Sequence, residues 1–144
     1  MKRILVKHSV LLGLLVVMAA CGSDSTAPQS AAGNYTAISW VTSGASGQTN
    51  QLSAGSTLSL SLATNGTTSG HLHVAASGSN PAFDADMAGT WAQSGTTVTF
   101  SQSADTFVRN MPFTLALDPA NGWTLVGDQI FSGTDVRVTL KRVG

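Results

Sequence analysis

The sequence predicts an all-β fold: an antiparallel up-and-down meander of about eight strands that closes into a small barrel. Short runs in which apolar and polar residues alternate recur from Gly33 onward, as expected of strands with one buried face. Clusters of Gly, Asn, Ser and Pro separate these runs at short intervals. All seven acidic residues are aspartates and Ser and Thr are abundant, a composition that favours strands and turns over helices.

The clearest strand covers residues 56–63, where Leu58, Leu60 and Leu62 alternate with serines. Asn65-Gly66 follows it, a dipeptide that accepts the positive φ angles of a type I′ hairpin turn. The remaining runs are read in the same way. The expected strands are residues 34–42, 56–63, 68–75, 83–93, 96–102, 107–117, 123–131 and 134–142.

These strands leave no room for crossover helices, because their connections are short. Closing the meander into a barrel removes the exposed strand edges. An immunoglobulin-like β-sandwich is the alternative, since it also needs seven or more short strands. It requires long crossovers, however, and the one long connection expected is residues 43–55. We expect a single domain over residues 33–144, which is long enough to bury a core.

The N-terminus has the layout of a signal peptide over residues 1–20. Lys2, Arg3 and Lys7 provide a positive start, and residues 10–20 form an apolar stretch. This stretch is short of the roughly 20 residues that a membrane-spanning helix needs. Export out of the cytoplasm is therefore expected.

The stretch ends in Met18-Ala19-Ala20-Cys21, which resembles the lipobox of bacterial lipoproteins. The resemblance implies that the Cys21 thiol receives a diacylglyceryl group and that cleavage occurs between Ala20 and Cys21. Ordinary secretion is the alternative, but its cleavage pattern would remove the cysteine. Gly22, where an aspartate would direct retention at the inner membrane, favours the outer membrane if the source has one. Residues 21–32 are then the lipidated cysteine and a flexible tether, because they are small and polar.

Charge argues against a nucleic-acid partner. The chain has seven basic and seven acidic residues, and three of the basic ones lie in the expected signal peptide. Removing that peptide would leave a net charge of −3. A mildly acidic domain lacks the clustered Lys and Arg that phosphate contacts need.

Gly33-Asn34-Tyr35 is similar to the Gly-x-Trp opening of the lipocalins, with Tyr in place of Trp. Basic residues lie in the last strand, where lipocalins place a basic side chain over that aromatic ring; they are Arg137, Lys141 and Arg142. The resemblance implies a small lipocalin-like barrel over about residues 33–143. A barrel of eight strands encloses either packed side chains or one small ligand.

His71, His73, Asp84 and Asp86 form the most pointed polar pattern. If residues 76–81 link two strands, His71 faces Asp86 and His73 faces Asp84 across the hairpin, all on the face opposite the apolar residues. His and Asp can bind zinc. Flat strand surfaces seldom bring four ligands to a tetrahedron, so we expect exposed cross-strand pairs and no metal site.

An apolar pocket is the main candidate binding site. Its expected lining is Met87, Trp91, Phe100 and Phe113, although a filled core is the alternative. Arg109 shares the two-residue period of Phe107, Met111 and Phe113, so it is expected to point at the core. A buried Arg109 would either anchor an anionic ligand or have a structural role, in which it bridges to Asp105, lies over an aromatic ring or extends to the barrel rim; we favour the structural role.

No catalytic constellation is present in the sequence. There is no Gly-x-Ser-x-Gly motif, no glutamate for a paired-carboxylate site and no Gly-rich loop that opens a helix. We therefore expect a non-enzymatic, membrane-anchored extracytoplasmic lipoprotein without a cofactor. Its expected role is to bind a small apolar ligand. The alternative is a structural or protein-interaction lipoprotein of the cell envelope with a filled barrel.

Overall fold

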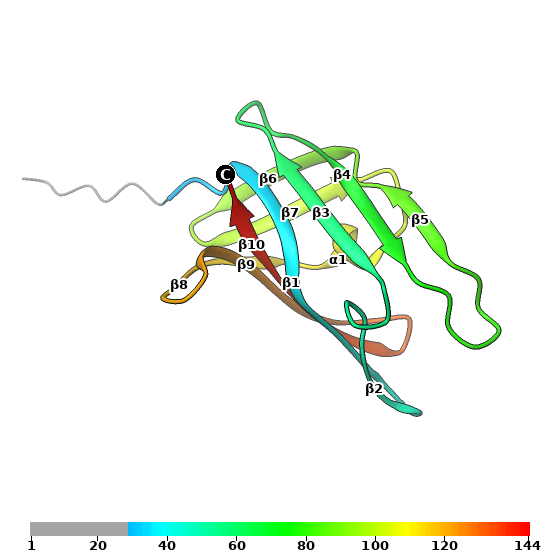
Figure 1. Ribbon diagram of the computed structural model, residues 1–144. Coiled ribbons are helices and arrows are strands. Elements are labelled where there is room, and N and C mark those ends of the chain that lie inside the picture. Colours follow the sequence, from blue (N-terminus) through cyan, green and yellow to red (C-terminus); the bar gives the residue numbers. More distant parts are fainter. Residues whose placement is uncertain (1–28) are drawn as a thin grey trace, which may run out of the picture.

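The computed structural model describes residues 29–144. The expected signal peptide, Cys21 and most of the expected tether lie outside these described residues. Strands dominate the described part, and one short helix interrupts them (Figure 1). The elements are β1 (Gly33–Gly44), β2 (Gly47–Asn50), β3 (Thr57–Leu62), β4 (Thr67–Val74), β5 (Phe83–Asp86), β6 (Gly89–Ser94), β7 (Thr97–Gln102), α1 (Phe107–Asn110), β8 (Phe113–Asp118), β9 (Gly122–Phe131) and β10 (Thr134–Val143).

Eight of the strands form a closed antiparallel barrel. They are hydrogen-bonded in the order β10-β9-β8-β7-β6-β4-β3-β1, and β1 pairs with β10 to close the ring. Strands β2 and β5 lie off this path, paired with β1 and β4. The predicted up-and-down barrel is confirmed, and the alternative sandwich is wrong because the ring has no second sheet.

The meander gives the barrel two distinct ends. One end, here called the N-terminal end, carries the start of β1, the end of β10 and the β3–β4, β6–β7 and β8–β9 turns. The other end, here called the helix end, carries the β1–β3 connection, α1 and the β9–β10 turn. Figure 1 shows the C-terminus beside the start of β1, as this arrangement requires.

Two connections differ in detail from the prediction. In the β3–β4 turn Gly66 has a φ of 84°, whereas Asn65 does not have a positive φ, so the turn is not type I′. The Asn65 carboxamide oxygen instead accepts hydrogen bonds from the backbone N–H and the hydroxyl of Thr67. The long connection 43–55 contains β2, which extends β1 into a hairpin.

The inner face of the barrel is filled with side chains. Leu58, Leu60 and Leu62 of β3 are all buried, as their alternation predicts. Aromatic and aliphatic residues from the other strands meet them. The fully buried large side chains are Tyr35, Leu58, Leu60, Leu72, Met87, Val98, Val108, Met111, Phe113, Leu125, Val138 and Leu140.

The expected strand 107–117 is wrong in its first half. Residues Phe107–Asn110 form α1, and β8 begins only at Phe113. In a helix the residues at 107, 108 and 111 share a face, and Phe107, Val108 and Met111 are indeed buried. Arg109 lies on the opposite side, with 46% of its side chain exposed. The expectation of a core-facing Arg109 failed because the two-residue period does not apply to a helical turn.

Helix α1 packs over the helix end of the barrel. The Phe107 ring lies 5.2 Å from the Trp40 ring of β1, and the Phe107 carbonyl accepts a hydrogen bond from the Gln129 side chain of β9. Met111 lies against the backbone of Gly127, where a Cβ atom would clash with its sulfur. Four residues are far too few to cross a bilayer, and residues 29–144 form no helix that could do so.

Candidate functional site

Three of the four residues expected to line a pocket are buried in the packed interior, and Trp91 is partly buried against it; Trp91 and Phe100 also border a small pocket of about 130 Å³ on β6 and β7. Met87 and Phe113 are fully buried, and the Phe100 ring packs edge-to-face on Phe113 at 5.4 Å. Trp91 pairs with Phe100 across the β6–β7 ladder, and its indole N–H donates to the Ala63 carbonyl at 2.8 Å. The structure thus brings these side chains together as mutual packing partners, with Trp91 partly exposed at the edge.

Arg109 does not join this group. Its guanidinium lies 3.8 Å from the Asp105 carboxylate, the partner that the sequence suggested. Both side chains are exposed, so this is a surface ion pair of little energetic weight. Arg109 therefore cannot anchor a ligand inside the barrel.

A shallow groove lies on the outside of the barrel wall, across β9, β10 and β1. Its volume is about 370 Å³. Arg137 lines it, and its guanidinium pairs with Asp128 at 3.0 Å and Asp135 at 3.5 Å. The lining residues are Ser39, Val41, Gln48, Val126, Gly127, Asp128, Arg137, Val138 and Thr139. Because its one cation is already paired with two carboxylates, the groove offers no free charge to an anionic ligand.

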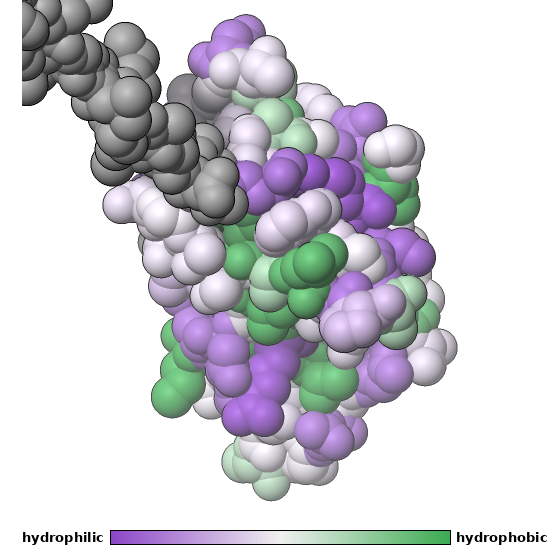
Figure 2. Space-filling view, turned by 90° about the vertical axis from the view of Figure 1, so that its left-hand side faces the viewer, coloured by the Kyte–Doolittle hydropathy of each residue, from purple (hydrophilic) through white to green (hydrophobic). Residues whose placement is uncertain are grey.

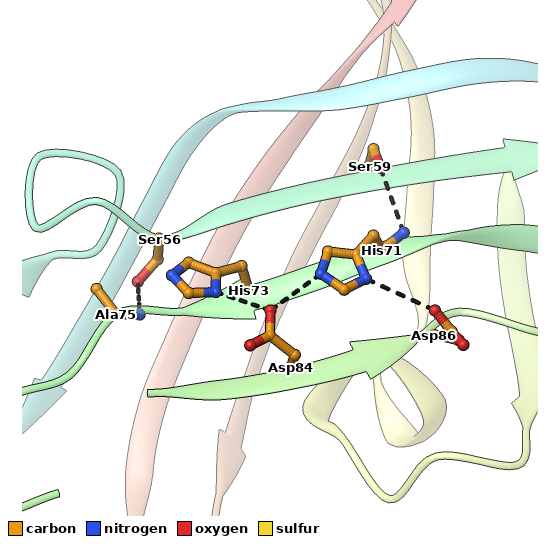
Figure 3. A network of polar contacts seen from close by, with 7 residues as sticks. All are labelled: Ser56, Ser59, His71, His73, Ala75, Asp84 and Asp86. Carbon is orange, nitrogen blue, oxygen red and sulfur yellow. Dashed lines mark hydrogen bonds and ion pairs between the residues drawn. The ribbon is translucent and has the colours of Figure 1, made fainter. Parts of the chain in front are cut away.

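The polar cluster on β4 and β5 has the predicted register. His71 lies opposite Asp86 and His73 opposite Asp84. Figure 3 shows that Asp84 is the centre: its Oδ1 lies 2.8 Å from His73 Nδ1 and 3.0 Å from His71 Nε2. His71 Nδ1 is 3.6 Å from the Asp86 carboxylate. The diagonal contact between His71 and Asp84 was not part of the prediction.

This cluster is solvated. Asp84 and Asp86 are exposed, and so is His71. The hydrogen bond from His73, and then that from His71, holds the pKa of Asp84 below its ordinary value. Within residues 29–144, no group of three or more His, Cys, Asp or Glu side chains is arranged to hold a metal ion. The geometry is that of cross-strand pairs which share one carboxylate oxygen.

The N-terminal end of the barrel carries a hydrogen-bonded site in which the sequence did not predict the part played by residues 29–31. Residues 29–31 belonged to the expected flexible tether, yet Ala31 is fully buried. Its N–H donates to the Gln93 side chain at 2.8 Å, and the same carboxamide donates to the Gln29 carbonyl. The Tyr35 hydroxyl donates to the Ala31 carbonyl at 2.8 Å. The ordered fold therefore begins ahead of Gly33.

Arg142 completes this site. Its Nη2 donates to the Ser30 carbonyl and, at 2.8 Å, to the Tyr35 hydroxyl, and its Nε donates to the same hydroxyl at 3.1 Å. The guanidinium also lies over the Tyr35 ring, 5.4 Å from its centre. Of the three basic residues in the last strand, Arg142 is the one that packs on the aromatic, as the lipocalin resemblance implies.

Two features of this site follow from burial and crowding. Desolvation raises the pKa of Tyr35, although the hydrogen bond and the charge of Arg142 oppose the shift. Gly33 has a φ of 149°, and a Cβ atom there would lie 3.0 Å from Arg142 Nε. The Gly33-x-Tyr35 pattern together with Arg142 is thus the sequence signal for this site.

Comparison with known proteins identifies no relative. No family model, no curated protein and no solved structure matches the chain.

Proposed function

We propose that this chain is a lipid-anchored, extracytoplasmic protein of the bacterial cell envelope. Its barrel acts as a non-enzymatic structural or protein-interaction module. The observation that carries the proposal is the position of residues 29–31. They are fastened to one end of a filled barrel by Tyr35, Gln93 and Arg142, eight residues after the lipobox cysteine. An anchor at Cys21 would therefore hold a preformed rigid body close to the lipid.

The filled interior favours this role over storage of a small apolar ligand inside the barrel. Small-molecule sites are concavities of roughly 300–1,000 Å³ lined by exposed apolar groups. Here Met87, Phe100 and Phe113 are buried in one hydrophobic core, where the Phe100 and Phe113 rings pack edge to face, and the groove of about 370 Å³ is on the outer wall. Residues 29–31 and α1 each cover one end of the barrel.

Mass spectrometry of the N-terminus tests the anchor. We expect the wild-type protein to begin at Cys21 and to carry the mass of a diacylglyceryl group, with further acylation in some hosts. Cys21→Ser should yield an uncleaved or unlipidated product, because the chain has no other cysteine. Ser25→Ala is the matched control and should be processed normally. An unmodified Cys21, or a first residue elsewhere, would end the lipoprotein proposal.

Titration with a fluorescent fatty acid tests the role of the barrel. A filled interior should give no saturable one-to-one binding. Saturable binding that is weakened by Phe100→Ala, and not by the outer-face change Thr99→Ala, would restore the small-ligand function.

A further inference from the structure

The N-terminal end of the barrel has an exposed apolar side chain at its rim, a position where polar residues are usual. Leu117 pairs with Trp123 across the β8–β9 hairpin. Leu117 lies on the inward-facing side of β8, the side that also carries the buried Phe113 and Leu115, yet it is 64% exposed. Trp123 is half-buried beside it. Figure 2 looks onto this end and shows hydrophobic side chains near the middle of the face, with hydrophilic residues around them.

Leu117 is exposed because its hairpin projects past the barrel. The backbone N–H of Leu115 donates to the Thr96 carbonyl in the β6–β7 turn. Among residues 29–144, β8 therefore has no paired strand on that side beyond this point, and residues 116–123 extend outward together. The turn at the projecting tip is closed by Asp118, whose carboxylate accepts hydrogen bonds from the backbone N–H groups of Ala120 and Asn121.

Charge is distributed unequally between the two ends. The last residues of β10, at the N-terminal end, include Lys141 and Arg142, and one aspartate, Asp118, lies near them. The other half of the barrel carries the remaining described aspartates with Arg109 and Arg137; these aspartates are Asp84, Asp86, Asp105, Asp128 and Asp135. The end with the exposed Leu117 and the half-buried Trp123 is thus basic, and the helix end is acidic.

The length of chain between Cys21 and Gln29 limits which end can reach a membrane. Eight residues span at most about 28 Å when fully extended. β9 and β10 have ten residues each, which corresponds to roughly 25 Å along the axis at the usual strand tilt. Only a fully stretched chain lying along the barrel wall could bring the helix end to the lipid surface.

We propose that the N-terminal end of the barrel docks on an anionic lipid surface, with the β8–β9 hairpin at the interface. The inference rests on the proposed lipid anchor at Cys21. Trp and Leu enter the boundary between headgroups and acyl chains, and Lys141 and Arg142 are attracted by anionic headgroups. The acidic helix end and the outer groove then face away from the membrane, where a partner can reach them.

Depth-dependent fluorescence quenching tests this orientation. The full chain is expressed in a host that processes lipoproteins and is reconstituted in vesicles of phosphatidylcholine and phosphatidylglycerol. An environment-sensitive dye is attached through Ala120→Cys, in the β8–β9 turn, or through Ser79→Cys, at the helix end. Quencher-labelled lipids should quench the dye at position 120 severalfold more than the dye at position 79.

Two matched variants test whether the quenching at position 120 depends on the exposed Leu117. Leu117→Ser should reduce quenching at position 120 severalfold. Ile130→Ser should leave it unchanged, because Ile130 is 76% exposed but lies near the helix end, where β9 pairs with β10. Vesicles of phosphatidylcholine alone should also reduce the quenching, since the attraction of Lys141 and Arg142 requires anionic lipid.

Flotation of the vesicles separates the two ways in which the proposal can fail. Protein that floats with the vesicles but is quenched equally at positions 120 and 79 has an anchor and no docked orientation, which overturns the inference alone. Protein that does not float, and that takes up dye at Cys21 as well, has no lipid anchor. That result overturns the proposed function and the docking with it.

Discussion

The two ends of the barrel are covered in different ways. At the helix end, Phe107 and Val108 of α1 and the C-cap residue Met111 are buried by apolar contacts. At the N-terminal end, a segment of main chain is held by hydrogen bonds to the side chains of Tyr35, Gln93 and Arg142. The first end depends on packing volume, and the second depends on donors and acceptors that meet at fixed distances.

The two ends also differ in whether their buried polar side-chain atoms have hydrogen-bond partners. Within residues 29–144, three buried side-chain polar atoms have no hydrogen-bond partner, on Trp40, Gln102 and Thr106. Trp40 packs on Phe107, Thr106 precedes α1, and Gln102 ends β7, so all three belong to the helix end. Apolar packing at this end buries the polar atoms of Trp40, Gln102 and Thr106 without giving them hydrogen-bond partners. At the N-terminal end the buried polar groups of Tyr35 are satisfied.

The largest expected effect is the loss of packing at the helix end. Phe107→Ala should lower the free energy of unfolding by about 3–5 kcal/mol, because it removes a buried ring that contacts Trp40. Urea unfolding monitored by tryptophan fluorescence measures this. Leu117→Ala, at the other end, is the control and should change stability by less than about 1 kcal/mol, since Leu117 is exposed. An equal loss of unfolding free energy in Phe107→Ala and Leu117→Ala would contradict this difference between the two ends.

A smaller loss is expected for the hydrogen-bonded end. Tyr35→Phe keeps the ring and removes the hydroxyl that bonds Ala31 and Arg142. It should cost about 1–3 kcal/mol, because partly buried donors and acceptors lose their partner. Hydrogen exchange at Ala31 should accelerate at the same time, whereas amides of α1 should keep their protection. Unchanged exchange at Ala31 would mean that the hydroxyl does not hold the segment.

Thr106→Val tests the unpaired polar atoms, and unlike the two variants above it is not expected to lower the free energy of unfolding. The hydroxyl of Thr106 is buried without a partner and makes no capping hydrogen bond to α1. Replacing it with a methyl group of the same shape should leave stability unchanged or raise it by up to about 1–3 kcal/mol. A calorimetric melting curve measures the change. A loss of about 1 kcal/mol would show instead that the hydroxyl caps the helix.

The pKa of Tyr35 provides a separate test of the contacts at the N-terminal end. A raised pKa means that the folded state holds the phenolic proton more tightly than the unfolded chain does. The resulting stability is complete below pH 10 and is lost as pH rises through the folded pKa. Tyr35 is the one tyrosine of the chain, so phenolate absorbance reports it directly. Arg142→Ala should raise its titration midpoint further, because Arg142 opposes the shift; a lower midpoint would contradict this.

The smallest expected effect is at Arg109. Its pair with Asp105 is exposed and 3.8 Å long, so Arg109→Ala should change the free energy of unfolding by no more than about 0.5 kcal/mol. Urea unfolding decides this as well, with Asp105→Asn as the companion variant. A loss of several kcal/mol would mean that the guanidinium is buried after all.

The sequence by itself determined the barrel, since period-two runs and short turns dictate an antiparallel meander that buries one face. It also determined the β4–β5 register, because aligning Leu72 with Ala85 leaves one pairing for His71 and His73. Only the tertiary structure decided how the ends are covered. Residues 107–110 are too few for a helical period to stand out, and Pro112 separates them from β8. Residues 29–31 have no apolar signal, because they are held by Tyr35, Gln93 and Arg142, which come from distant points in the chain.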